Sequence, residues 1–196
     1  MELLERDGIR LIKVERPEEV IPFRAGFVGA YQTIFRGPPY HEMFSPSEAE
    51  GVLTRILQTP GHLTLLAVRG RTKVVGFGCG VPLASRPDVY RDMHGLLPLQ
   101  HTFYLAELGI LPRFRGRGIG RLLVEKRLEL VDPQVFTHVV LRTSARNDLA
   151  YQLYEKMEFE DMGVYQEVAS RRVNGSVRTD RRLFLSRVLH PAAQEE

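Results

Sequence analysis

The chain has 196 residues, of which 43% are hydrophobic and 26% are charged, the balance of one globular domain with a proper core. Its formal net charge of +3 is too small to indicate a nucleic-acid partner by itself. The single cysteine, Cys79, excludes a disulfide within the chain and a cysteine-based zinc cluster, so we expect a buried, inert thiol and no metal ion.

The first ten residues carry three acidic side chains and no apolar core, which is not the pattern of a signal peptide. No apolar run approaches the ~20 residues that a membrane span needs. We therefore expect a cytoplasmic protein without a membrane partner. No linker or internal repeat divides the chain, so a single domain is expected over residues 1–190, followed by a flexible tail at 191–196.

Apolar periodicity and turn residues predict the following elements in chain order. The first half is expected to contain a strand at Ile9–Val14, helices at 20–35 and from Ser45 to just before Pro60, and a hairpin of His62–Val68 and Val74–Leu83. After a long loop at 84–100, the second half is expected to contain a strand at His101–Leu111, a helix at 118–131, a strand at His138–Thr143, a helix at Asn147–Met157, and strands at Val164–Val168 and Leu183–Val188, with a basic loop from Arg171 to Ser176 before the last strand. Hairpins followed by β-α units predict an α/β (α+β) fold, a mixed sheet with helices on both faces.

The most informative stretch is a glycine-rich loop that follows a strand and opens a helix. It reads Arg115-Gly116-Arg117-Gly118-Ile119-Gly120-Arg121. Glycines allow successive backbone N–H groups to converge on an anion, and the start of the helix adds partial positive charge. The loop lacks the Gly-Lys-Ser/Thr ending of a Walker loop, and Arg121 stands where a dinucleotide fingerprint needs its third glycine. The stretch predicts a phosphate or pyrophosphate site, with an ordinary glycine-rich turn as the alternative.

The hexapeptide Arg115-Gly116-Arg117-Gly118-Ile119-Gly120 resembles the pyrophosphate loop of the GNAT superfamily of N-acetyltransferases, Gln/Arg-x-x-Gly-x-Gly/Ala. Residues 147–159 resemble its second signature, in which an Asn opens a helix and an Ala and a Tyr precede a Gly-Phe pair; here Glu158 replaces the glycine. The resemblance implies the GNAT fold, a central, mostly antiparallel sheet flanked by helices. It also implies acetyl-CoA as cosubstrate and transfer of its acetyl group to a primary amine by direct attack in a ternary complex.

The resemblance further implies which residues bind the cosubstrate. The backbone amides of residues 115–121 would hold the pyrophosphate of coenzyme A, and the strand around Leu108, Gly109 and Ile110 would pair with the pantetheine arm. Asn147 would hydrogen-bond the same arm, and helix capping is a compatible alternative for it. The expected cofactor-binding set is Leu108, Gly109, Ile110, Arg115, Gly116, Arg117, Gly118, Ile119, Gly120, Arg121 and Asn147.

Two residues are candidate catalytic groups. Strict strand alternation places Glu107 on one face with Phe103, Leu105 and Gly109. Burying a carboxylate among apolar neighbours costs free energy, so such a residue is rarely found there without a function or a partner. The resemblance implies a general base that takes the proton of the incoming ammonium, and a structural ion pair with a helix arginine is the alternative. Tyr154 lies on the apolar stripe of its helix, which favours a core position, whereas the resemblance implies an acid that protonates the leaving thiolate.

The acceptor is the least determined part of the site. The resemblance implies a groove bordered by Phe35–Phe44, residues 84–100 and residues 171–182. Aromatic and acidic side chains in the first two segments suit a cationic amine, while the arginines of the third suit an acidic group, so small-molecule and peptide amines both stay open. A homodimer is compatible with the sequence. The alternative function is a non-catalytic coenzyme A-binding module, which would need neither candidate catalytic residue; nucleic-acid binding lacks any recognisable motif.

Overall fold

The computed structural model describes residues 1–144 and 149–189, so Asn147 and the expected tail at 191–196 lie outside the described residues. The strands are β1 Glu2–Arg6, β2 Ile9–Val14, β3 Leu63–Arg69, β4 Lys73–Pro82, β5 Thr102–Ile110, β6 His138–Ser144, β7 Glu160–Arg171 and β8 Val177–Val188. The α-helices are α1 Arg24–Arg36, α2 Pro46–Leu57, α3 Pro87–Asp92, α4 Ile119–Leu130 and α5 Leu149–Glu155. Within this part of the chain, no helix is both long and apolar enough to span a membrane.

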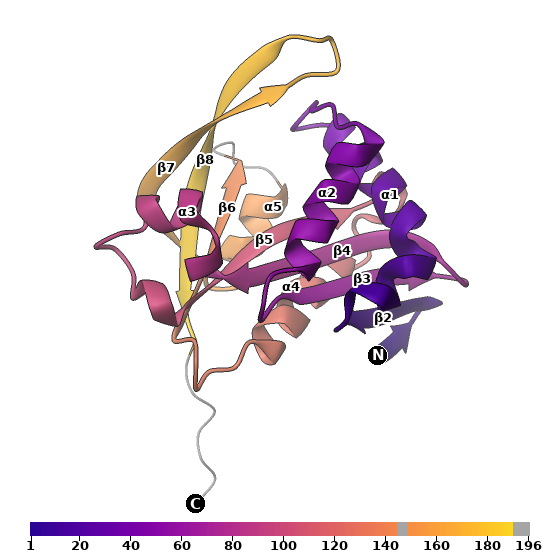
Figure 1. Ribbon diagram of the computed structural model, residues 1–196, viewed down its shortest axis with the longest axis horizontal. Helices are drawn as coiled ribbons and strands as arrows, with labels where there is room; N and C mark the ends of the chain where they lie inside the picture. Colours follow the sequence, from indigo (N-terminus) through magenta and orange to yellow (C-terminus); the bar gives the residue numbers. More distant parts are fainter. Residues whose placement is uncertain (145–148, 190–196) are drawn as a thin grey trace, which may run out of the picture.

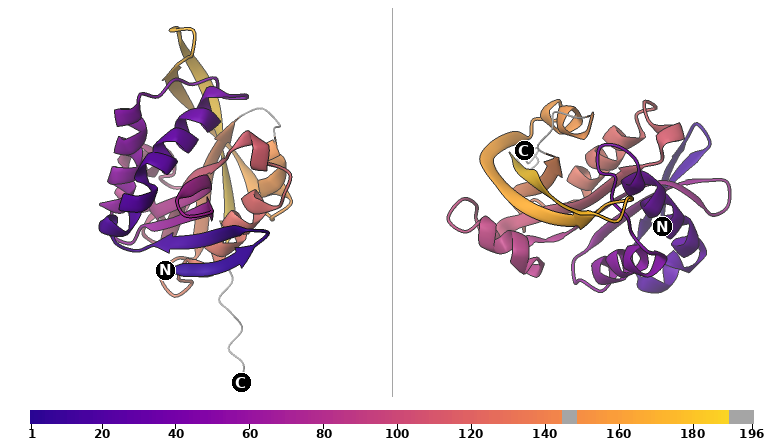
Figure 2. Two further views of the ribbon diagram at one scale, coloured as in Figure 1. Left: turned by 90° about the vertical axis from the view of Figure 1, so that its right-hand side faces the viewer. Right: turned by 90° about the horizontal axis from the view of Figure 1, so that it is seen from above.

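The described strands form one sheet in the order β1-β2-β3-β4-β5-β6-β8-β7. Among these strands only β5 and β6 pair in parallel, and every other neighbouring pair is antiparallel. Helices α1 and α2 cover one face of the sheet and α4 and α5 cover the other (Figures 1 and 2). The expected architecture, a mostly antiparallel mixed sheet with helices on both faces, is confirmed.

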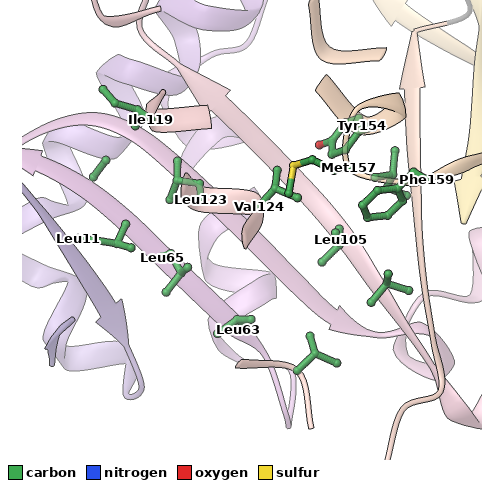
Figure 3. Packing of buried hydrophobic residues seen from close by; sticks show 14 of the residues in the cluster. Leu11, Leu63, Leu65, Leu105, Ile119, Leu123, Val124, Tyr154, Met157 and Phe159 are labelled. Carbon is green, nitrogen blue, oxygen red and sulfur yellow. The ribbon is translucent and has the colours of Figure 1, made fainter. Parts of the chain in front are cut away.

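Apolar side chains from both faces of the sheet form the core. On the α1–α2 side, Phe27 and Phe77 pack with ring centroids 4.7 Å apart, and both are fully buried. On the α4–α5 side, Leu65, Leu123 and Phe159 belong to one buried cluster, part of which is drawn in Figure 3. Burying a side chain of this size stabilises the fold by roughly 1.5–3 kcal/mol, so both helix layers are held to the sheet chiefly by apolar contact.

Helix α2 begins where the sequence predicts. The backbone N–H of Glu48 donates to the hydroxyl of Ser45 at 3.2 Å, and the N–H of Ser45 donates to the Glu48 carboxylate at 2.6 Å. This capping box, with Pro46 in the first turn, satisfies two backbone groups that a helix start otherwise leaves open. The first helix, expected at 20–35, begins later because a 3₁₀ segment at Pro17–Phe23 contains Pro22, whose ring disfavours an α-helix interior.

The structure differs from the expected elements in three places: strand β1, the lengths of β7 and β8, and the segment at 84–100. Strand β1 was not predicted, although Asp7 and Gly8 both have positive φ and form the tight turn that joins it to β2. Strands β7 and β8 are at least twice as long as expected, because the residues that lengthen them are mostly polar and exposed, and they pair with each other beyond the apolar segments. The loop at 84–100 contains α3 and two 3₁₀ segments, Leu83–Ser85 at its start and Leu99–His101 at its end.

The long hairpin of β7 and β8 extends beyond the rest of the sheet toward the α1–α2 loop (Figure 1). It turns at Asn174 and Gly175, as predicted; Gly175 has a φ of 81°, and the Asn174 side chain accepts from the Ser176 N–H at 3.1 Å. The backbone N–H of Met43 donates to the carbonyl of Arg171 at 2.8 Å, and that of Val173 donates to His41 at 3.1 Å. The tip of the hairpin is therefore fastened to the α1–α2 loop.

Candidate active site

Strands β5 and β6 separate part-way along their length. Their pairing runs from Thr102 opposite His138 to Leu105 opposite Leu141, and no pair follows among the described residues. Strand β6 nevertheless continues alongside β8 as far as Ser144. The edge of β5 that faces β6 therefore lacks a strand partner beyond Leu105 in the described chain. Apart from the Ile110 carbonyl, which accepts from Arg115, its backbone polar groups are available to an extended ligand.

A cavity of about 390 Å³ lies at this opening. Its size is within the range of small-molecule sites. The cavity brings together residues from β5, β6, α1, α5, the α1–α2 loop and the long hairpin. The lining includes both candidate catalytic residues: Tyr31, Phe35, Tyr40, Glu42, Met43, Phe44, Glu48, Leu105, Ala106, Glu107, Leu108, Arg142, Thr143, Ser144, Ala150, Tyr154, Val168, Ala169, Ser170, Arg171 and Arg182.

A β-bulge decides which way Glu107 points. Glu107 lies opposite Cys79, but Tyr104 lies opposite Val81, so β5 carries one extra residue between the two pairs. An extra residue reverses the alternation of side chains. Leu105 packs with the α4–α5 cluster, whereas the Glu107 carboxylate lies next to Tyr31 of α1. The expected common face of Glu107 with Phe103 and Leu105 is therefore wrong, and the reason is the bulge.

The carboxylate of Glu107 is only partly solvent-accessible, and burial raises its pKa to about 7. The positive charges of Arg86 and Arg142 oppose this rise, and the negative charge of Glu42 adds to it. The Tyr31 hydroxyl donates to the carboxylate across a long contact of 3.5 Å. Within the described chain the carboxylate has no ion pair, so the alternative of a structural pair with a helix arginine finds no support: Arg127 of α4 binds the backbone carbonyl of Glu107 instead.

Tyr154 combines a core position with a place in the cavity wall. Its side chain is 5% exposed, and its ring packs edge-on against Phe159 with centroids 5.4 Å apart (Figure 3). The predicted stripe of Ala150, Leu153 and Met157 also joins this cluster. Helix α5 ends at Glu155, and Glu158 adopts a φ of 62°, the left-handed conformation that the family's glycine would favour. The ring is packed in the core while the residue still borders the cavity, so the two expected roles are compatible.

The glycine-rich loop has the geometry of an open anion cradle. Gly116 and Gly118 have φ values of 73° and 76°, which other residues adopt only with strain. A Cβ added at either position would meet no atom within 4 Å, so the loop is open on that side. Gly118 starts α4 without a side-chain cap, and the amides of the first turn lack intrahelical acceptors. The loop thus presents N–H groups at the positive end of a helix.

The arginines of the loop are less directly available than the sequence suggests. The Nε of Arg115 donates to the carbonyl of Ile110 at 3.1 Å, and that of Arg121 donates to Glu125 at 2.7 Å. Arg117 lies over the ring of Phe114, 5.4 Å from its centroid. Arg115 thereby ties the loop to the end of β5, and the charge of Arg121 is already balanced. The backbone supplies most of the cradle.

The opposite wall of the cavity rests on a buried ion pair. Arg182 of β8 donates to Glu42 of the α1–α2 loop at 2.5 Å, with side chains only 11% and 9% exposed. The guanidinium of Arg182 also lies over the ring of Tyr40, 4.9 Å from its centroid. Arg171 and Glu48 form a second pair at 3.0 Å, about half exposed, at the rim. Segments 35–44 and 171–182 therefore meet, as expected for two borders of an acceptor groove.

The third expected border does not reach the cavity: none of residues 84–100, all described, belongs to the lining. Asp88 instead pairs with Arg86 at 3.0 Å and lies 3.7 Å from Arg142. The segment therefore contributes through its charges, since Arg86 and Arg142 are the two cations that act on the pKa of Glu107. Tyr31 and Arg142 are lining residues that the sequence analysis missed. Arg142 could have been found in the sequence, because it is a charged residue inside an apolar strand, the same pattern that identified Glu107. Tyr31 is buried in an apolar helix face, and no sequence pattern marks it as a site residue.

Cys79 is fully buried, and burial raises the pKa of its thiol to about 12. Such a thiol is protonated at neutral pH and is a poor nucleophile. The expectation of an inert, buried cysteine is confirmed. The residue nevertheless lies directly opposite Glu107 across the β4–β5 pair, a proximity that its position in the sequence did not indicate.

Solved structures with this fold are numerous. Ribosomal-protein-alanine N-acetyltransferase from Brucella melitensis is 19% identical, with a TM-score of 0.65 over 91% of this chain and 99% of that one. The structure of Arabidopsis thaliana NAA60 in complex with acetyl-CoA is 16% identical, with a TM-score of 0.62 over 92% and 98%. At these identities the likeness establishes the shared fold.

Two curated proteins match shorter stretches. A probable N-acetyltransferase family 8 member 5 from Mus musculus is 31% identical over 96 residues, which is 49% of this chain and 38% of that protein. N-acetylaspartate synthetase from Homo sapiens is 38% identical over 63 residues, 32% of this chain and 21% of that protein. The match thus covers less than half of either curated relative.

Residues 28–159, more than half of the chain, match the family described as Acetyltransferase (GNAT) family. This range runs from α1 to the end of the second signature and includes the glycine-rich loop, Glu107 and Tyr154. The fold, the cradle and the sequence match agree with one another. The chain belongs to the acetyltransferase (GNAT) family.

Proposed function

We propose that this protein transfers an acetyl group from acetyl-CoA to a primary amine by direct attack in a ternary complex. The observation that carries the proposal is one cavity, at the opening between β5 and β6, that holds both Glu107 and Tyr154 in its wall. The glycine-rich loop starts α4 just beyond the end of β5. A carboxylate, a phenol, an unpaired strand edge and an anion cradle are the groups that this transfer needs.

In the proposed arrangement, the amides of residues 115–121 bind the pyrophosphate, with Arg115, Gly116, Arg117, Gly118, Ile119, Gly120 and Arg121 all contributing. The free edge of β5 around Leu108, Gly109 and Ile110 pairs with the pantetheine arm. The thioester would then lie beside the bulge, where backbone N–H groups can polarise its carbonyl. Asn147, outside the described residues, stays a predicted partner of the same arm.

Glu107 is proposed to take one proton from the acceptor ammonium, directly or through water. The amine lone pair then forms the new C–N bond, and the C–S bond of the thioester breaks. Tyr154 is proposed to protonate the leaving thiolate. The nitrogen, positively charged after the attack, loses its second proton as the intermediate collapses; this proton restores the Tyr154 hydroxyl through water, and the proton taken by Glu107 leaves to solvent. A base works best when its pKa is close to the working pH. The pKa of Glu107, raised to about 7 by burial, meets that condition.

The alternative is a module that binds coenzyme A without turnover. Such a module needs the cradle but has no use for a carboxylate whose burial carries a cost. The partly buried Glu107 therefore favours the enzyme. The acceptor class is proposed only as far as an amine, small molecule or peptide, because the cavity wall carries both carboxylates and guanidinium groups.

The test is an acceptor panel with acetyl-CoA, in which released thiol is measured for amines, amino acids, polyamines and peptides with free N-termini. We expect turnover with at least one primary amine, and none with the matched N-acetylated or tertiary amine. Thermal melts with acetyl-CoA, NAD and ATP form the second arm. A ligand at 100 times its dissociation constant stabilises the folded chain by about 2.7 kcal/mol. Stabilisation by acetyl-CoA without turnover on the whole panel would support the binding module.

A further inference from the structure

Arg127 is a fully buried cation in the third turn of α4, on the side that faces the sheet. Its Nε donates to the carbonyl of Leu123 at 3.2 Å. Its Nη1 donates to the carbonyls of Cys79 and Glu107, both at 3.1 Å. None of these partners is a carboxylate, and Nη2 is buried without a hydrogen-bond partner among the described residues. A buried charge compensated only by neutral carbonyls is costly, so its position calls for a reason beyond packing.

The two carbonyls lie at the bulge that directs Glu107. Cys79 and Glu107 face each other across β4 and β5, directly before the register shift to Val81 and Tyr104. A bulge disrupts the ladder of backbone hydrogen bonds and leaves local polar groups without their regular partners. One guanidinium nitrogen bonds to both strands at this point. Arg127 thus acts as a clamp across the irregular step.

Gly78 provides the space for this clamp. A Cβ added at Gly78 would lie 3.0 Å from Nε of Arg127 and 3.3 Å from its Cδ and Cζ, and these are the nearest atoms. The φ of Gly78 is not in the left-handed region, so its backbone does not require glycine. Glycine at position 78 is therefore explained by the space that the Arg127 guanidinium needs, and not by a turn in the backbone.

We propose that Arg127 is a positioning residue for the acetyl transfer, because it holds the β5 bulge and thereby keeps the Glu107 carboxylate directed into the cavity. The inference rests on the proposed function of Glu107 as the base. A strand that loses its bulge regains regular alternation, which would move Glu107 toward the α4–α5 face. Arg127 does not itself line the cavity, and its only hydrogen bond to a lining residue in the described chain goes to the backbone carbonyl of Glu107, so its effect reaches the reaction through β5.

The test compares Arg127→Met, Arg127→Lys and Gly78→Ala with the control Lys126→Met. Lys126 is the neighbouring residue of α4, and its ammonium pairs with Glu129 at the surface at 2.5 Å. We expect Arg127→Met to lower kcat about tenfold or more, since small misplacements of a catalytic group have effects of this size. The KM for acetyl-CoA should change by less than about threefold, because the cradle is untouched.

The conservative variants separate positioning from packing. Lysine can still donate to one of the two carbonyls, so Arg127→Lys should recover part of the lost kcat. Gly78→Ala displaces the guanidinium by a few tenths of an ångström without removing it, and should lower kcat in the same direction by a smaller factor. Both variants also keep the proposal testable if Arg127→Met fails to fold. Lys126→Met should match the wild type.

Amide hydrogen exchange over residues 104–108 supplies a readout that needs no turnover. Arg127→Met should exchange faster than Lys126→Met in this segment, with α4 itself unchanged. Unaltered exchange at β5, or full kcat per folded molecule in Arg127→Met and Gly78→Ala, would overturn the inference. If the wild type turned over no amine, the proposed function would fail, while the exchange measurement would still decide whether Arg127 holds the bulge.

Discussion

The two sides of the candidate site are built in different ways. The proposed cosubstrate wall consists of β5, the glycine-rich loop and the start of α4, which follow one another directly in the chain, and of these only β5 lines the cavity itself. The proposed acceptor wall joins the α1–α2 loop to the β7–β8 hairpin through contacts between residues such as Glu42 and Arg182, 140 positions apart. One wall is set by local backbone geometry, and the other by long-range side-chain pairing.

This difference separates a part of the site that depends on the backbone from a part that depends on side chains. A cradle of backbone amides needs glycines and a helix start, and it binds the same group whatever side chains surround it. An acceptor wall built from paired charges can change its partner by changing one residue. The Glu42–Arg182 pair, buried against Tyr40, is therefore the part of the candidate site that depends most on individual side chains.

The largest expected effect on stability comes from breaking the acceptor wall. Arg182→Met leaves the Glu42 carboxylate buried without its partner and should lower the free energy of unfolding by about 3 kcal/mol. The KM for the acceptor should rise, while the Kd for acetyl-CoA stays the same. Arg171→Met is the control, because its pair with Glu48 is about half exposed and should contribute less than ~1 kcal/mol. Equal losses from the two variants would contradict the comparison.

Glu107→Gln tests the proposed general base, which lies on β5 in the cavity lining. We expect kcat to fall by about 10²-fold or more, as for loss of a general base, with coenzyme A affinity kept. Because the wild-type base acts when deprotonated, its kcat/KM should rise with pH through about 7, the raised pKa of Glu107. The glutamine variant should lack this step, and the titration of the acceptor amine, common to both proteins, cancels in the comparison. Wild-type turnover in the variant at neutral pH would exclude Glu107 as the base.

Stability gives an independent check on the same variant. The folded pKa of Glu107 is raised from 4.5, so the carboxyl group favours the folded state fully below about pH 4.5, and this contribution is lost as the pH rises through about 7. Glutamine does not titrate. Glu107→Gln should therefore be at least as stable as the wild type at pH 8, and a loss of activity there cannot be assigned to unfolding.

The cosubstrate wall is tested at Gly120, which lies in the first turn of α4 with ordinary helical backbone. An added Cβ would meet only Leu153 at 3.5 Å and Ile110 at 3.8 Å, which is normal contact. An aspartate in a first turn favours the helix dipole but repels a bound pyrophosphate. Gly120→Asp should thus fold and weaken coenzyme A binding about tenfold or more, a loss of ~1.4 kcal/mol. Gly120→Ala is the steric control, and equal affinities by calorimetry would refute the cradle.

The smallest expected change is at Tyr154. Tyr154→Phe removes one oxygen and keeps the edge-on packing against Phe159. We expect a fall in kcat of about tenfold from loss of the acid and a stability change of about 1 kcal/mol. A destabilised protein with full turnover would show that the tyrosine serves the core alone. Thermal denaturation and steady-state kinetics on the same preparation give both numbers.

The sequence by itself determined the features that depend on neighbours along the chain. Hydrophobic alternation predicted most strands, and Ser45 and Glu48 predicted the start of α2. The glycines at 116 and 118 predicted an open loop of converging amides, which the structure forms with positive φ at both positions. The anion cradle was predictable for the same reason, since it needs only consecutive amides at a helix start. The family match followed from these local motifs.

Tertiary structure decided the features that depend on distant partners. The bulge opposite Cys79 moved Glu107 to the α1 face, and no alternation rule for a single strand can reveal a register shift against its neighbour. The docking of the long hairpin on the α1–α2 loop buried Glu42 with Arg182, although nothing near Glu42 in the sequence indicates burial. Gly78 of β4 leaves room for the guanidinium of Arg127, which comes from helix α4, distant in the sequence. Side-chain burial and pairing between separate elements are properties of the packed fold, and only the packed fold could supply them.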